Sequence, residues 1–204
     1  MRIGIVGHAG SGKSTLARAL ATALGVPLVQ DFVLDALQEN IGKPSWRGVK
    51  DTRIRRTIRL QGLEKKIAAE MTNESFVSDK TVIDYLAYWL QNQAEFETKE
   101  STQQFVERVK EHIPRYDKCI FLPYRPDVDW ADDRSQDPVH NLKVAGLKRG
   151  LLSVLGVPTV DAPYTFGEDA QAWVERWLAA PKPAAEPAAA TEAKPKKAAK
   201  AKKK

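Results

Sequence analysis

Gly7-His8-Ala9-Gly10-Ser11-Gly12-Lys13-Ser14 follows the apolar run Arg2–Val6 and opens an Ala/Leu-rich stretch that ends at Gly25. Its spacing is that of a phosphate-binding loop lying between a strand and a helix. Glycines let backbone N–H groups point at phosphate oxygens, while Lys13 adds charge at the β- and γ-phosphates and Ser14 coordinates magnesium. We therefore expect ATP and Mg²⁺ to be the cofactors. The expected nucleotide-binding residues are Gly7, His8, Ala9, Gly10, Ser11, Gly12, Lys13, Ser14 and Thr15.

Strand and helix patterns alternate along the chain after this loop. The expected strands are Arg2–Val6, Val26–Gln30, Ser75–Ser78, Lys118–Leu122 and Val157–Val160. The expected helices are Lys13–Leu24, Val33–Asn40, Val49–Met71, Thr81–Gln93, one opened by a capping box at Ser101–Gln104, His140–Leu155 and Glu168–Ala179. This order predicts an α/β fold, with a five-stranded parallel sheet covered by helices on both faces. Active residues should lie at the carboxyl ends of the strands, where Gly7, Asp31 and Asp79 fall.

The positive charge is concentrated at the end of the chain. The whole chain of 204 residues has a formal net charge of +6, and residues 181–204 alone hold eight lysines and two glutamates, which also gives +6. Residues 1–180 are therefore neutral on balance. We expect one kinase domain over 1–180 and a disordered Lys/Ala/Pro-rich tail over 181–204, because the tail lacks the large apolar residues that form a core.

The composition also limits the location of the protein. The single cysteine, Cys119, excludes an intramolecular disulfide and lies in an apolar run typical of a buried strand. No stretch approaches the roughly 18 consecutive apolar residues of a membrane span. We expect no membrane contact and a cytoplasmic location, which is the host cytoplasm if the protein is viral.

The class of phosphate-loop protein follows from motifs that are missing. A GTP-binding switch protein should carry Asn-Lys-x-Asp and Asp-x-x-Gly, and neither occurs. A short chain with a small insertion after the second strand suits an enzyme that phosphorylates small or nucleotide-like acceptors. Such an enzyme needs an acid to accept the acceptor's proton, a magnesium ligand and a cation over the transferred group.

Four residues are the expected catalytic set. Lys13 holds the phosphates; Asp31 orients or deprotonates the acceptor hydroxyl, although an N-cap role is an alternative. Asp79 is a magnesium ligand, together with Ser14, or an acceptor contact, again with an N-cap alternative. Arg134, in a polar stretch after the fourth strand, closes over the transferring phosphoryl group. Lys148 and Arg149 are weaker candidates for that last role, and Asp84 is expected on the helix surface or in support of the site.

An arginine-rich helix is the second basic feature. Arg53, Arg55, Arg56 and Arg59 lie on the helix expected at Val49–Met71. They form either a solvated face or a groove for an acceptor phosphate or a DNA backbone. Trp46, just before this helix, either stacks on a base or caps the core. Tyr85, Tyr88 and Trp89 alternate with aliphatic residues, so packing is their expected role.

The order of these motifs resembles the nicotinamide-riboside-kinase-like branch of P-loop kinases, which is related to thymidylate and deoxynucleoside kinases. The matching segments are Gly7–Ser14, Asp31, Asp79–Tyr88, Tyr116–Pro123, Asp133-Arg134 and Pro158–Asp161. This branch includes phage enzymes that phosphorylate 5-hydroxymethyluracil in DNA, a step toward hypermodified thymidine. Lys80 departs from the arginine usual after the acid of the third strand.

Three functions follow from these features. The preferred one is a DNA 5-hydroxymethyluracil kinase that holds DNA through the basic tail and the arginine-rich helix, because lysines near the backbone release counterions. The second is a kinase of a free nucleoside, deoxynucleoside monophosphate or nicotinamide riboside. The third is a DNA-associated ATPase or adaptor.

Overall fold

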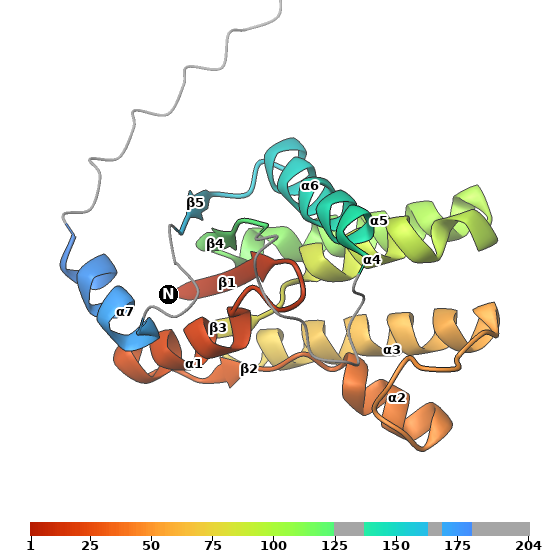
Figure 1. The fold of residues 1–204 in the computed structure, drawn as a ribbon, viewed down its shortest axis with the longest axis horizontal. Helices are drawn as coiled ribbons and strands as arrows, with labels where there is room; N and C mark the ends of the chain where they lie inside the picture. The colour runs from red at the N-terminus through yellow and green to blue at the C-terminus, as the bar shows by residue number, and fades with distance from the viewer. Residues whose placement is uncertain (125–136, 163–168, 181–204) are drawn as a thin grey trace, which may run out of the picture.

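The computed structural model describes residues 1–124, 137–162 and 169–180, and within them five strands form one parallel sheet (Figure 1). The strands are β1 (Arg2–Gly7), β2 (Leu28–Val29), β3 (Phe76–Asp79), β4 (Lys118–Leu122) and β5 (Thr159–Asp161). Their order is β2-β3-β1-β4-β5, and every neighbouring pair is parallel. The predicted α/β fold is thus confirmed, with some strand bounds shifted by one or two residues.

Seven α-helices and two short 3-10 helices connect and follow the strands in the described part of the chain. They are α1 (Lys13–Leu24), α2 (Val33–Ile41), α3 (Thr52–Met71), α4 (Val82–Asn92), η1 (Ala94–Phe96), α5 (Lys99–His112), η2 (Ile113–Arg115), α6 (Pro138–Val154) and α7 (Ala170–Ala179). No helix in the described ranges is both long and apolar enough to cross a membrane.

The helices cover both faces of the sheet. On one face, α1 and α7 bury a cluster that includes Leu16, Ile120 and Trp173. On the other, α3, α4, α5 and α6 surround a larger cluster that includes Trp89 and Phe105, whose rings stack with their centroids 4.2 Å apart. Because both faces are covered, the edge where the strands end is left for polar chemistry.

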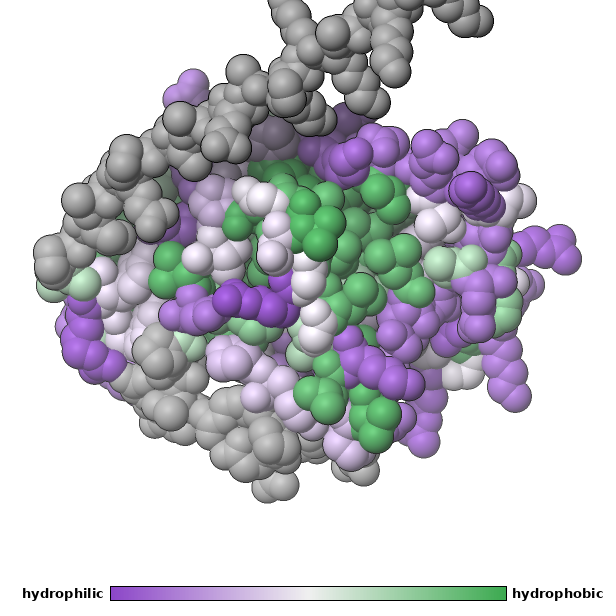
Figure 2. Space-filling model, turned by 90° about the horizontal axis from the view of Figure 1, so that it is seen from above, coloured by the Kyte–Doolittle hydropathy of each residue, from purple (hydrophilic) through white to green (hydrophobic). Residues whose placement is uncertain are grey.

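Several helix bounds differ from the sequence prediction: α3 begins at Thr52 rather than Val49, and α6 begins at Pro138 rather than His140. The helix expected to start with a capping box at Ser101–Gln104 begins earlier, at Lys99, because the Thr98 side chain accepts the hydrogen bond from the Ser101 amide. In α6, Val154 is 83% exposed, whereas Leu152 is buried. Apolar side chains gather on the face seen from above in Figure 2, the side on which α6 lies.

Candidate active site

The phosphate loop lies between β1 and α1 and has the backbone that the motif requires. Gly10 and Gly12 have φ angles of 80° and 86°, a left-handed conformation that favours glycine. A Cβ atom on Gly7 would lie 2.8 Å from the Ser11 hydroxyl and 2.9 Å from the Leu122 carbonyl oxygen. The loop therefore needs glycine at these positions for conformational and steric reasons.

The N-terminus of α1 has the features of an anion-binding site. Gly12 caps the helix without a side-chain hydrogen bond, and no acidic residue lies in the first turn. Ser14 and Thr15 are exposed there. The free N–H groups and the positive end of the helix dipole can therefore receive phosphate oxygens.

Lys13 is folded back into its own loop. Its ammonium group is buried and donates a hydrogen bond to the carbonyl oxygen of His8. Burial, together with the nearby charge of Lys148, lowers the pKa of Lys13 to about 7. His8 itself is buried and packs edge-on against Tyr124, with ring centroids 5.0 Å apart.

Asp31, just beyond the end of β2, is held by three neighbours. It forms an ion pair with Lys80, and its Oδ1 accepts hydrogen bonds from the Tyr85 hydroxyl at 2.8 Å and the Val33 amide at 3.2 Å. Burial opposes ionisation, but Lys80 outweighs it, so the pKa of Asp31 is lowered. Lys80 itself adopts a left-handed backbone conformation with φ of 59°. The carboxylate is thus charged and fixed in orientation.

Asp79 ends β3, directly beside β1, where it is in register with Ile5. Its Oδ1 is buried and has no hydrogen-bond partner. A buried carboxylate oxygen without a partner is costly unless a ligand completes its coordination. An oxygen ligand at this position suits Mg²⁺ or a water bound to it.

The described residues contain no cluster of three or more His, Cys, Asp or Glu side chains that could hold a metal ion. In phosphoryl-transfer sites Mg²⁺ is held by one or two protein oxygens together with substrate phosphates and water. The exposed Ser14 hydroxyl and the unpartnered oxygen of Asp79 fit that pattern.

Lys148, a weaker candidate for the role expected of Arg134, is instead fully buried beneath the phosphate loop. Its ammonium donates to the Gly7 carbonyl oxygen at 2.6 Å and forms an ion pair with Asp84 at 2.7 Å. It also lies 4.5 Å from the centroid of the Tyr88 ring. Arg149, the other weaker candidate, forms an ion pair with Asp161. Lys148 therefore links α6 and α4 to the loop.

Asp84 is in turn fully buried rather than on the helix surface, and it supports the site from α4. Its Oδ2 accepts a hydrogen bond from the Thr81 amide at 2.9 Å and completes a capping box with Thr81. Support of the site was one of the two roles expected for Asp84, but the sequence did not indicate the hydrogen bonds and the ion pair through which it acts.

Lys66 ties the ends of two strands together from α3. Its ammonium donates to the carbonyl oxygens of Val29, Gln30 and Asp79 at 2.8–3.0 Å. Burial lowers its pKa to about 8. Glu70, one turn away and also fully buried, lies 3.7 Å from this ammonium. Lys66 thereby fixes the backbone next to Asp31 and at Asp79.

The four arginines near the start of α3 lie in two different environments. Arg53 is exposed, and Arg56 forms an ion pair with Glu97 at 3.0 Å, as expected of a solvated face. Arg55 and Arg59 are half-buried, and the Nε atom of each is buried without a hydrogen-bond partner.

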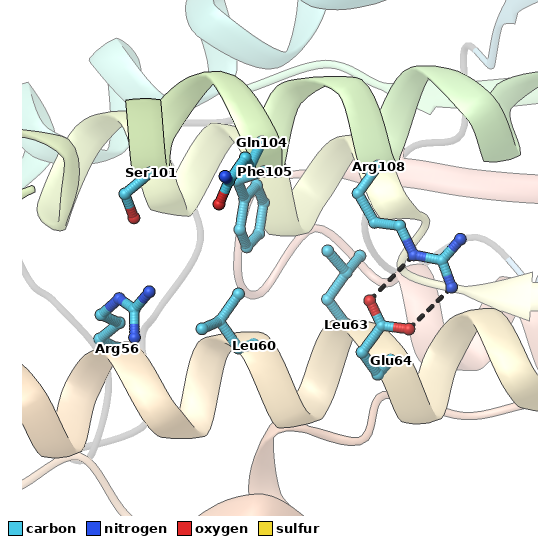
Figure 3. Close-up of a pocket in the computed structure, with 8 residues that line it drawn as sticks. All are labelled: Arg56, Leu60, Leu63, Glu64, Ser101, Gln104, Phe105 and Arg108. Carbon is cyan, nitrogen blue, oxygen red and sulfur yellow. Dashed lines mark hydrogen bonds and ion pairs between the residues drawn. The ribbon is translucent and has the colours of Figure 1, made fainter. Parts of the chain in front are cut away.

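A shallow groove of about 210 Å³ lies between α3 and α5 (Figure 3). Arg108 and Glu64 bridge it with two hydrogen bonds of 2.9 and 2.8 Å. Its lining residues are Arg56, Leu60, Leu63, Glu64, Ser101, Gln104, Phe105 and Arg108. None of them belongs to the phosphate loop or the strand ends, so this groove is separate from the candidate active site.

Arg134 and the tail at 181–204 lie outside the described residues, as do Asp132 and Asp133. The structure brings the other expected catalytic residues, Lys13, Asp31 and Asp79, to one edge of the sheet. Tyr85 was expected to be a packing residue. It is largely buried and also orients Asp31.

A family model described as an AAA domain matches residues 2–169. The chain belongs to this AAA-domain family. No curated protein sequence matches this member of the family.

Three of the solved structures with the same fold are two kinases and a protein in complex with NAD and AMP-PNP. Deoxyadenosine kinase from M. mycoides with bound dATP matches with a TM-score of 0.60 and 12% identity over 88% of this chain and all of its own. Shikimate kinase from Acinetobacter baumannii in complex with shikimate matches with a TM-score of 0.55 and 14% identity. The match covers 87% of this chain and 90% of the shikimate kinase chain. NadR in complex with NAD and AMP-PNP matches with a TM-score of 0.56 and 15% identity. The match covers 90% of this chain and 51% of the NadR chain. At these identities the likeness establishes the P-loop kinase fold.

Proposed function

We propose that this protein is an ATP-dependent kinase that transfers the γ-phosphoryl group to a hydroxyl of a nucleotide-like acceptor. The observation that carries the proposal is the state of Asp31. It is an oriented carboxylate, held ionised by Lys80 at the sheet edge that also carries the phosphate loop. An acid in that position can accept a proton from an attacking hydroxyl.

The roles of the other residues follow from their positions. The loop amides and Lys13 bind the phosphates of ATP, and Lys13 leaves the His8 carbonyl to do so. Ser14 and Asp79 would hold Mg²⁺, which neutralises charge on the β- and γ-phosphates when bound. Lys66 and Lys148 keep the strand ends and the loop in place.

The chemical step assigned to this chain is a proton transfer with positioning. The acceptor hydroxyl donates its proton to Asp31 as its oxygen bonds to the γ-phosphorus, and ADP leaves on the opposite side. Tyr85 keeps the carboxylate turned toward the acceptor. We assign to Arg134 the closure over the transferring group, as its sequence context indicated.

The preferred acceptor is the hydroxymethyl group of 5-hydroxymethyluracil in DNA. It is supported by the motif order and by the +6 charge of residues 181–204 beside a neutral body. The second candidate is a free nucleoside or nucleotide. The likeness of the fold to deoxyadenosine kinase and to NadR favours this candidate.

An acceptor panel tests both candidates. ATP labelled in the γ-phosphate is offered with DNA containing 5-hydroxymethyluracil, with ordinary DNA, and with free nucleosides and nucleotides. Label in hydroxymethyluracil DNA alone supports the first candidate. Label only in free nucleosides or nucleotides rejects it in favour of the second. DNA-stimulated phosphate release without labelled acceptor rejects the kinase proposal and supports an ATPase.

A further inference from the structure

One face of α3 runs outward from the candidate active site. Lys66, Gly62, Arg59 and Arg55 are spaced by four, three and four residues, so they lie on the same side of the helix. At the inner end, Lys66 contacts the ends of β2 and β3. A Cβ atom on Gly62 would lie 3.2 Å from the ring of Tyr85, the residue that orients Asp31.

The outer end of this face is therefore close to the acceptor position. With a helical rise of about 1.5 Å per residue, Arg59 lies roughly 4–5 Å and Arg55 roughly 10 Å along the axis from Gly62. Both arginines therefore lie within about 10 Å, along the helix axis, of the glycine that packs against Tyr85.

Arg55 and Arg59 have positive charges that the described residues do not neutralise. Neither forms an ion pair with a carboxylate in the described ranges, and each has a buried Nε atom without a hydrogen-bond partner. Other arginines do have carboxylate partners: Arg2, Arg56, Arg108 and Arg149. A buried donor without a partner is costly, so a bound acceptor group would relieve that cost.

The surroundings of this pair favour an anion. Burial, and then the neighbouring charge of Arg55, lowers the pKa of Arg59 to about 10, so the Arg59 guanidinium is still charged at neutral pH. The guanidinium of Arg59 lies 4.9 Å from the centroid of the Trp46 ring, which limits its orientations. The carboxylate of Asp31, which Tyr85 orients, is already paired with Lys80.

We propose that Arg55 and Arg59 bind a phosphate group carried by the acceptor. A planar guanidinium donates two parallel hydrogen bonds to phosphate oxygens, and two adjacent guanidinium groups suit its charge. The proposal deepens the kinase function and rests on it. It favours a nucleoside monophosphate or a DNA phosphodiester over an uncharged nucleoside, and it disfavours a cationic acceptor such as nicotinamide riboside.

Equilibrium binding tests this site directly, with the full chain and with the phosphate loop filled by AMP-PNP. The probes are thymidine, thymidine monophosphate and a short single-stranded DNA containing 5-hydroxymethyluracil. The variants are Arg55→Gln, Arg59→Gln and Arg59→Lys. The matched control is Arg53→Gln, an exposed arginine on another side of the same helix.

We expect Arg55→Gln and Arg59→Gln each to raise the Kd of the phosphate-bearing probe by about 10- to 100-fold. Arg59→Lys should raise this Kd by a smaller factor, because lysine keeps the charge but lacks the planar guanidinium that donates two parallel hydrogen bonds. Thymidine binding should be unaffected, and Arg53→Gln should leave the Kd of thymidine and of thymidine monophosphate unchanged. Whether the monophosphate or the DNA carries the effect identifies the source of the phosphate.

The inference is overturned if neither phosphate-bearing probe binds tighter than thymidine, or if Gln variants weaken all probes equally. Melting temperatures of the variants, compared with Arg53→Gln, show whether a lost Trp46 contact has simply unfolded the helix. AMP-PNP binding distinguishes a failure of the kinase proposal from a failure of the phosphate site alone. Its absence in the wild-type protein rejects the kinase proposal, whereas its presence without an arginine effect rejects only the phosphate site.

Discussion

Lys148 and Asp84 form a buried ion pair that holds the phosphate loop from below, and replacing Lys148 by methionine tests this role. Both side chains are fully buried, and the same ammonium donates to the Gly7 carbonyl oxygen. Methionine keeps most of the apolar stem, so the main loss is the charge and its two polar contacts.

The magnitude follows from what is left behind. Without Lys148, the carboxylate of Asp84 stays buried and keeps only its capping contacts with Thr81. Removing one partner of a buried pair costs about 3–5 kcal/mol. We therefore expect the free energy of unfolding to fall by about 4 kcal/mol. Because domains of this size are stable by roughly 5–15 kcal/mol, the variant should still fold.

Urea denaturation followed by tryptophan fluorescence measures this change. Lys143→Met, at an exposed position of the same helix, is the control and should lie within about 0.5 kcal/mol of wild type. Adding Asp84→Asn to Lys148→Met removes the uncompensated charge. The double variant should therefore be less destabilised than the sum of the single ones, with a coupling of about 2 kcal/mol. A loss below about 1 kcal/mol for Lys148→Met, or additive effects, would refute the reasoning.

Further predictions concern the acceptor acid, the tail and the surface. Asp31→Asn should lower kcat by about 100- to 10,000-fold while leaving the Kd of AMP-PNP unchanged, and equal losses in both would contradict its role as a base. Lys80→Met removes the cation that lowers the pKa of Asp31 against the effect of burial, so the acidic limb of the kcat/KM profile should move to higher pH; an unmoved limb counts against the pair. Deleting residues 181–204 should weaken DNA binding and reduce its salt dependence without changing AMP-PNP affinity, and identical salt slopes would show that the tail does not recruit DNA. Arg108→Gln should change the free energy of unfolding by less than about 1 kcal/mol in urea titrations, because its ion pair with Glu64 is exposed, and a loss comparable to that of Lys148→Met would contradict this.

The phosphate loop and the sheet edge could be predicted because their signals are local. Glycine spacing fixes the loop backbone. Apolar strands that alternate with helices along the chain predict a parallel sheet, which places Asp31 and Asp79 at the same edge. The strand order could not be predicted, since it depends on which helices cross which face.

The buried lysines were missed for a different physical reason. A lysine in a helical sequence is usually solvated, and nothing local to Lys148 or Lys66 shows the carbonyl groups that receive it. A weak signal exists for Lys148: it lies four residues from both Val144 and Leu152, two buried residues of α6. For Tyr85, helical spacing correctly indicated burial, but the hydrogen bond of its hydroxyl to Asp31 depends on a partner 54 residues away.

Transfer of labelled γ-phosphate from ATP to an acceptor, compared between the wild-type protein and Lys13→Ala in a single turnover, tests the central claim most directly. The account predicts that the wild-type protein moves the label to an acceptor hydroxyl and that Lys13→Ala does not, although it remains folded. Label found only in inorganic phosphate with every acceptor offered, or equal transfer by Lys13→Ala, would contradict it.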